Sequence, residues 1–154
     1  MRAVLAFALL AAAPVAAQTD PTRFAAAADV RAQVAAMLKA MAPGQGFAWR
    51  PLVQDDTHVA GLEIWKKPGR PAVHPDDAEY VTVIDGAGTL ETGGTLVAPK
   101  VVKPDLTEGD RIAGGTTRPL KPGDVFLIPA GVPHGFGITG DRLVLLGMKV
   151  PVVR

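Results

Sequence analysis

A histidine that directly follows a tight turn is the residue of this chain best placed to do chemistry. The stretch 123–138 reads GDVFLIPAGVPHGFGI, and His134 comes just after its Pro- and Gly-rich turn. Such a turn fixes the direction of the backbone, so the strand that follows would hold the imidazole at a fixed depth and angle. A metal ligand or a general base needs this placement, whereas an ordinary surface histidine does not.

A second stretch, HPDDAEYVTVIDG at 74–86, supplies another histidine and a carboxylate. Side chains alternate between the two faces of a strand, so Glu79, Val81 and Val83 share one face. If that face lines the inside of a barrel, Glu79 points inward near the start of its strand. The sequence therefore predicts that His74, Glu79 and His134 meet at one point.

The segments that would position these residues are a helix followed by many short strands. Apolar residues recur at helical spacing over 20–41, and Pro43-Gly44 ends this predicted helix, which we expect to pack across a sheet. Short strands separated by Gly, Pro and Asp clusters are typical of a sandwich or barrel. The segment 99–120 is the least regular and fits either a long loop near the mouth of a barrel or part of an edge strand. The predicted strands are 47–53, 58–65, 80–85, 89–91, 95–97, 125–128, 134–138 and 143–150.

The N-terminus has the pattern of a secretory signal peptide. Arg2 precedes an apolar run over 3–13, Pro14 breaks the run, and a small-residue cleavage site ends at Ala17. We therefore expect cleavage after Ala17 and a secreted or periplasmic protein. The predicted division is a signal peptide at 1–17, a helical segment at 18–45 and a β-barrel domain at 46–154.

Composition excludes several classes of function. The formal net charge is +1, aromatic residues make up 5% of the chain and no basic run occurs, so we expect no binding to nucleic acid. The sequence contains no Cys, Ser or Asn, which rules out a Ser or Cys nucleophile and an Asn-linked glycan. Beyond the predicted signal peptide, no apolar stretch is long enough to span a membrane, so we expect no membrane span in the mature form.

The stretch 123–138, which contains His134, resembles the second sequence motif of the cupin superfamily. That motif reads G-x5-P-x-G-x2-H-x3-N. Gly123, Pro129, Gly131 and His134 match it at the same spacing, and Ile138 stands at the place of the terminal Asn.

The stretch around His74 resembles the first cupin motif, G-x5-H-x-H-x3,4-E-x6-G. His74, Glu79 and Gly86 match its second histidine, its glutamate and its closing glycine. Ala72 stands at the place of the first histidine, and Lys66 at that of the opening glycine.

The resemblance implies an all-β fold, a cupin jelly-roll β-barrel preceded by an N-terminal α-helix. The chain is also similar to small secreted bacterial cupins through its GGTL and GGTTR segments. Cupins typically hold one divalent metal through three histidines and one glutamate, which implies His74, Glu79 and His134 as ligands of Zn, Mn, Cu or Fe here. Two histidines and one carboxylate leave positions open for water or substrate. Cupin barrels commonly dimerise, so the resemblance also implies a homodimer.

Several residues near the predicted site keep alternative interpretations. Either His58, which begins a predicted strand, or Glu63, which shares a strand face with Trp65, would complete the ligand set. Asp76 and Asp77 are expected as turn residues rather than as ligands.

Two functions are compatible with these residues. One is an exported, metal-dependent enzyme that carries out oxygenation, isomerisation or lyase chemistry on a small polar molecule. The other is a non-catalytic module that binds or senses a small ligand, and Ala72 and Ile138 at two motif positions favour it. A purely structural interaction domain is a third, minor alternative.

Overall fold

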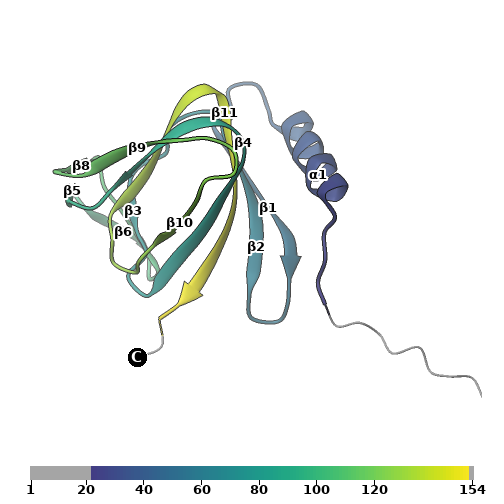
Figure 1. The fold of residues 1–154 in the computed structure, drawn as a ribbon. Helices are drawn as coiled ribbons and strands as arrows, with labels where there is room; N and C mark the ends of the chain where they lie inside the picture. Colours follow the sequence, from purple (N-terminus) through teal and green to yellow (C-terminus); the bar gives the residue numbers. More distant parts are fainter. Residues whose placement is uncertain (1–21, 153–154) are drawn as a thin grey trace, which may run out of the picture.

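Strands dominate residues 22–152, the part of the chain that the computed structural model describes; the predicted signal peptide lies outside it. The all-β prediction with an N-terminal helix is confirmed, because α1 is the one helix of these residues (Figure 1). The elements, in chain order, are α1 (Ala27–Ala40), β1 (Phe47–Gln54), β2 (Val59–Trp65), β3 (Ala72–Val73), β4 (Asp77–Thr92), β5 (Thr95–Val97), β6 (Lys100–Lys103), β7 (Leu106–Glu108), β8 (Arg111–Ala113), β9 (Thr116–Leu120), β10 (Val125–Ile128) and β11 (His134–Pro151).

Hydrogen bonding joins most of these strands into one nine-stranded sheet. Its main path runs β1-β2-β11-β3-β7-β6, and β4 pairs with β11, β9 and β10. Strands β5 and β8 form a separate two-stranded sheet. Among the described residues the pairing does not close into a ring, since β1, β6, β9 and β10 each pair on one side alone. The large sheet is instead strongly curved (Figure 1).

The two longest strands, β4 and β11, lie antiparallel at the centre of the fold. The sequence predicted each of them as two separate short strands, and the structure corrects this. Their shared register is interrupted between Ile138 and Leu143, where four residues of β11 have no partner on β4, and again between Val144 and Leu145. Inward-facing positions are even-numbered in β11 at His134 and Phe136 but odd-numbered from Leu143 onward, so this interruption resets the alternation.

Alternation along the strands divides the core into two clusters. The inner cluster lies inside the curved sheet and includes Val81 and Val83 of β4 and Leu143 and Leu145 of β11. The outer cluster lies between the sheet and α1. Its buried members are Val34, Met37, Leu62, Ile64 and Val144.

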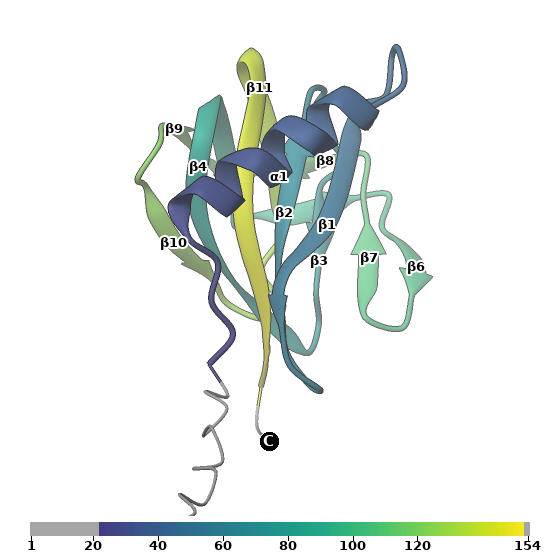
Figure 2. The ribbon, with the colours of Figure 1, turned by 90° about the vertical axis from the view of Figure 1, so that its right-hand side faces the viewer.

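Helix α1 lies across the outer face of β4, β11, β2 and β1 (Figure 2). Asp29 accepts a hydrogen bond from the backbone N–H of Ala26 at 2.9 Å, and a negative charge in the first turn is favourable there. Gln33 donates to the carbonyl oxygen of Pro51 at 2.7 Å and ties the helix to β1. The helix begins at Ala27, later than the predicted residue 20, and ends one residue before the predicted 41.

Two further differences from the predicted elements concern loops. The segment 99–120, expected as irregular or as part of one edge strand, contains the four short strands β6 to β9. Strand β2 begins at Val59, which leaves His58 in the turn before it.

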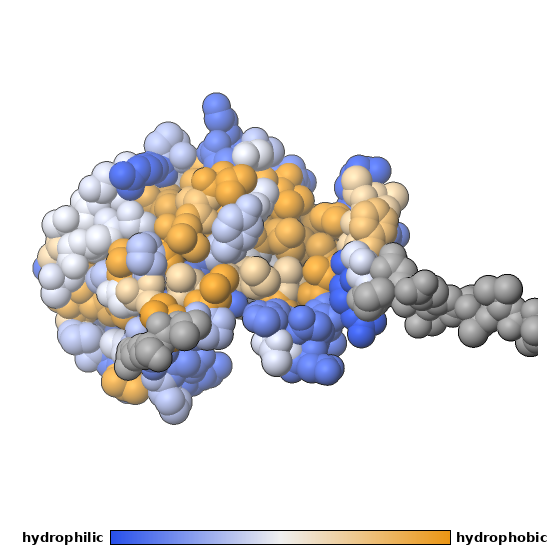
Figure 3. All heavy atoms as spheres, turned by 60° about the horizontal axis from the view of Figure 1, so that its bottom comes forward, coloured by the Kyte–Doolittle hydropathy of each residue, from blue (hydrophilic) through white to orange (hydrophobic). Residues whose placement is uncertain are grey.

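Apolar residues also reach the surface of the molecule (Figure 3), and the exposed ones include Val125 and Leu127 of β10. No helix of residues 22–152 has the length and apolar character needed to cross a bilayer.

Replacing Met37 by Ala should destabilise the fold, because Met37 is 1% exposed and fills the outer cluster. We expect the free energy of unfolding to fall by about 2–4 kcal/mol, as for other large-to-small core changes. Chemical denaturation checks this, with the exposed Lys39→Ala of the same helix as a control that should change stability by less than about 0.5 kcal/mol. An equal loss in both variants would contradict the packing described for α1.

Candidate metal centre

The turn before β11 positions His134 and is tied to His74 through the backbone. Gly131 has a φ of 78°, a left-handed conformation that glycine adopts without strain. Its N–H donates to the carbonyl oxygen of His74 at 2.8 Å. The turn that orients one histidine therefore also fixes the backbone of the other, although the two residues are far apart in the sequence.

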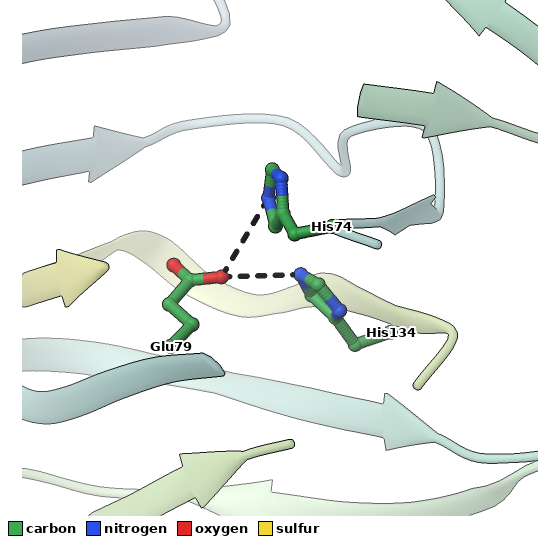
Figure 4. Close-up of side chains that lie close together, drawn as sticks. All are labelled: His74, Glu79 and His134. Atoms are coloured by element: carbon green, nitrogen blue, oxygen red, sulfur yellow. Dashed lines mark ion pairs between the residues drawn. The ribbon is translucent and has the colours of Figure 1, made fainter. Parts of the chain in front are cut away.

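The three side chains that the sequence singled out converge (Figure 4). Glu79 of β4 is 7% exposed, and its Oε2 lies 3.2 Å from Nε2 of His134 and 3.9 Å from Nε2 of His74. One ligand atom from each residue lies within 4.8 Å of the other two, which makes this a candidate metal-binding group. The inward placement of Glu79 beside Val81 and Val83 follows the alternation predicted from the sequence.

Backbone carbonyl groups orient both imidazole rings. Nδ1 of His134 lies 3.1 Å from the carbonyl oxygen of Val132, and Nδ1 of His74 lies 2.9 Å from that of Asp105. When Nδ1 carries the hydrogen for such a bond, the lone pair of a neutral imidazole is on Nε2, and this pattern is typical of metal-ligating histidines. Both Nε2 atoms point toward Glu79, so the orientation suits metal ligation.

Burial and charge act in opposite directions on Glu79. Burial would by itself raise the pKa of its carboxyl. The hydrogen bond from His134 and the nearby charges of His134, His74 and Lys149 outweigh burial and hold that pKa below its usual value. For His74, burial is the main cause that lowers the pKa, despite the hydrogen bond to the Asp105 carbonyl. A carboxylate and a readily neutral imidazole are the protonation states that a metal requires of its ligands.

These residues fit a divalent metal by the chemistry of their donor atoms. Imidazole nitrogen suits Zn, Cu and Fe, and a carboxylate oxygen suits Mn as well. Three protein ligands are also the number that catalytic metal sites commonly use, which leaves open positions for other molecules. His74, Glu79 and His134 would hold the metal, and their identity does not select one metal among the four.

The group of three lies in the wall of a cavity of about 780 Å³. Another part of the wall is largely aromatic, with Phe47, Trp49 and Trp65, whose rings come from β1 and β2. Phe47 and Trp65 pack with ring centroids 4.3 Å apart. A cavity with an apolar wall and a few convergent polar groups is typical of small-molecule sites.

Ala72 also lines this cavity, at the place where the first cupin histidine is expected. It is the register partner of His134, so the two side chains are neighbours across the β3–β11 pair. The first histidine of the cupin pattern is therefore replaced by a methyl group beside the candidate metal centre.

His58, the first residue considered for completing the ligand set, is not brought into the group. It is exposed in the turn between β1 and β2, where its backbone N–H donates to Asp55 Oδ1 at 2.6 Å and its ring lies 2.7 Å from the hydroxyl of Thr57. Asp77 lines the cavity, but neither it nor the exposed Asp76 belongs to the group of three.

Glu63, the second residue considered, does line the cavity but lies outside the group. Its Oε2 accepts a hydrogen bond from the Trp65 indole at 2.8 Å. Its Oε1 and that of Glu79 both lie 3.6 Å from the point where a Cβ on Gly147 would stand, so the two carboxyls border one gap over β11. Burial, followed by the charge of Glu79, raises the pKa of Glu63 to about 7.

Two groups beside the site were missed by sequence reasoning. Lys149 lines the cavity, and its Nζ lies 3.1 Å from Nδ1 of His74. The alternation from Leu143 through Leu145 along β11 could have placed it on the inner face. The carbonyl of Asp105, in the turn between β6 and β7, carries no side-chain pattern that would reveal it.

Comparison with solved structures identifies the fold. KdgF from Halomonas sp. matches with a TM-score of 0.50 and 20% identity, over 73% of this chain and 87% of its own. TT1209 from Thermus thermophilus matches with 0.51 and 19%, over 74% and 93%. The cupin domain of Cnp3 from Schizosaccharomyces pombe matches with 0.52 and 13%, over 75% and 72%. Neither a scan of protein-family models nor a search of curated proteins finds a match.

At these identities the likeness concerns the fold. The protein has the cupin fold, with the helix α1 added at its N-terminal side, as its two sequence motifs predicted. Within that fold it carries a buried His-Glu-His group that is a candidate metal centre.

Glu63→Gln should make stability depend less on pH. The pKa of this carboxyl is near 4.5 in the unfolded chain and about 7 in the folded chain. The contribution of Glu63 to the free energy of unfolding is therefore fully present below about pH 4.5 and is lost as pH rises through 7. The glutamine side chain of the variant cannot ionise and keeps an acceptor for Trp65. We measure both proteins without metal and compare their free energies of unfolding. Between about pH 5 and pH 8 the variant should gain on the order of 1–2 kcal/mol relative to wild type, which is less than the full pKa shift implies because water reaches the cavity.

Urea denaturation at a series of pH values measures this difference. Glu91→Gln, which removes a carboxyl outside the cavity lining, controls for the loss of one negative charge. A stability difference for Glu63→Gln that is the same at every pH would contradict the raised pKa.

Proposed function

We propose that this protein is an exported cupin that holds one divalent metal ion at His74, Glu79 and His134 and binds or transforms a small polar molecule in the adjacent cavity. One observation carries the proposal: two imidazole rings, each oriented by a backbone carbonyl, direct Nε2 at the same buried carboxylate oxygen. The cavity of about 780 Å³ beside them supports a small-molecule ligand.

The three residues would supply different ligand atoms and charges to the metal. His134 and His74 would supply neutral nitrogen ligands, and Glu79 would supply the one negative charge that balances part of the metal charge. A bound divalent ion supplies Lewis-acid polarisation of a substrate oxygen. The aromatic wall of Phe47, Trp49 and Trp65 would pack against the carbon skeleton of the molecule in the cavity.

A non-catalytic binding or sensing role is the second candidate function. Ala72, whose methyl group lines the cavity beside His134, supports it, because the loss of one ligand is expected to weaken metal affinity. Dimerisation stays a prediction of the family resemblance.

Metal uptake by the mature protein tests the proposal. After exposure to Zn, Mn, Cu or Fe(II) and removal of free metal, mass spectrometry should find one metal per chain. His134→Ala should bind the same metal at least about 100-fold more weakly, since even the loss of a hydrogen-bond partner of a ligand costs about 10–100-fold. His58→Ala removes an exposed histidine outside the group and should bind like wild type.

Ala72→His should strengthen metal binding relative to wild type, because it restores a nitrogen donor next to His134. No uptake of any of the four metals by the wild-type protein would refute the metal site. Metal uptake without turnover on a broad panel of small polar substrates would favour the binding role over an enzyme.

The proposed export rests on the pattern of Arg2, the apolar run and the cleavage site at Ala17. Expression of the full chain in a bacterial host should yield a periplasmic or secreted form whose intact mass corresponds to an N-terminus at Gln18. An uncleaved chain found entirely in the cytoplasm would contradict export.

A further inference from the structure

Lys149 and the backbone of Asp105 make incompatible demands on a single nitrogen atom. Nδ1 of His74 lies 2.9 Å from the carbonyl oxygen of Asp105 and 3.1 Å from Nζ of Lys149. The carbonyl oxygen accepts a hydrogen bond, so it requires Nδ1 to carry a proton. The ammonium group donates, so it requires Nδ1 to present a lone pair. The nitrogen can satisfy one of these neighbours at a time.

Metal ligation would decide between the two. With Nε2 as the ligand, a neutral His74 carries its proton on Nδ1 and donates it to Asp105. Nδ1 can then no longer accept a hydrogen bond from Lys149, and the ammonium group faces an N–H group and a nearby cation. Within residues 22–152, its other polar contact is Asp105 Oδ2 at 3.5 Å, an exposed carboxylate that holds it weakly.

The geometry points to a ligand-binding role for Lys149: it competes with the Asp105 carbonyl for Nδ1 of His74 in the metal-free protein and, once a metal is bound, turns into the cavity to bind the carboxylate of a small organic acid. This inference rests on the proposed function and names the chemical class of its ligand. Lys149 is suited to the role because it already lines the cavity and its side chain is 42% exposed.

The charges around the site favour an anionic ligand. A divalent ion, the carboxylate of Glu79 and the ammonium of Lys149 sum to a positive charge, with both histidines neutral. Three other acids line the cavity, namely Glu63, Asp77 and Glu108, and Glu108 is paired with Arg70 at 3.5 Å. Because Arg70 and Lys103 also line the cavity, the net charge stays positive even with all three of these acids ionised. The apolar wall then favours an acid with a carbon skeleton over a fully hydrated inorganic anion.

Two titrations on wild type and Lys149→Met test the inference, since Met removes the charge and the donor but nearly keeps the length of the side chain. Zn²⁺ alone is titrated first, by calorimetry. Benzoate is then titrated into each Zn-loaded protein. Both tryptophans of the chain, Trp49 and Trp65, line the cavity, so their fluorescence provides a second readout of benzoate binding.

We expect opposite changes in the two affinities. Lys149→Met should bind Zn²⁺ severalfold more tightly, because the competing donor and a like charge are gone. It should bind benzoate about tenfold more weakly or worse, because a charge-assisted hydrogen bond is lost. Lys149→Arg keeps the charge and should retain most of the benzoate affinity. A merely structural role of Lys149 would not move the two affinities in opposite directions.

Lys103→Met is the matched control, because Lys103 lines the same cavity and has no hydrogen bond to His74 among the described residues. It should leave Zn²⁺ affinity unchanged. Benzyl alcohol and inorganic phosphate replace benzoate in two further titrations, and weaker binding of both to wild type supports an organic carboxylate as the ligand. Phosphate binding as tight as that of benzoate would overturn this assignment.

The results distinguish failure of the Lys149 role from failure of the proposed metal-binding function. Equal affinity of wild type and Lys149→Met for Zn²⁺ would refute the role of Lys149 and leave the metal site standing. Equal affinity of the two proteins for benzoate would do the same. If wild type binds no metal, the proposed function fails and the inference fails with it.

Discussion

A carboxylate buried among apolar residues is the constraint on which this structure depends. Glu79 is 7% exposed and shares a strand face with Val81 and Val83, which are fully buried. A charge in such a place is costly unless it is paired and hydrogen-bonded. His134 and His74 meet this requirement from two other segments, and the N–H of Gly131 holds their backbones together.

The same alternation that buries Glu79 also separates the structural part of the molecule from the chemical part. On β2, Leu62 and Ile64 point outward to α1, while Glu63 and Trp65 point into the cavity. The helix therefore stabilises the sheet from the face opposite to the site. The inner face carries an apolar cluster as well as the polar groups around the cavity, and the outer face adds a second apolar cluster against α1.

Sequence reasoning was most accurate where a residue type and a local backbone shape occur together. The turn before His134 and the strand face of Glu79 could be predicted because Pro, Gly and period-two alternation act over a few residues. The continuity of β4 and β11 could not, since glycines such as Gly86 and Gly137 look like strand ends although the pairing runs through them. The contacts of His74 with Asp105 and Lys149 depend on how distant segments pack, and one of them involves a backbone atom that any residue type would provide.

The interruption of the register between β4 and β11 determines what can vary in this fold. His134 and Lys149 lie on one strand at positions of opposite parity, and both face the cavity only because the alternation is reset at residues 139–142. The length of this segment therefore matters to the site. Insertion or deletion of one residue there would move the side chains at one end of β11 from the inner face of the sheet to the outer face. Relatives that keep this site should therefore conserve the number of residues in this segment more strictly than their types.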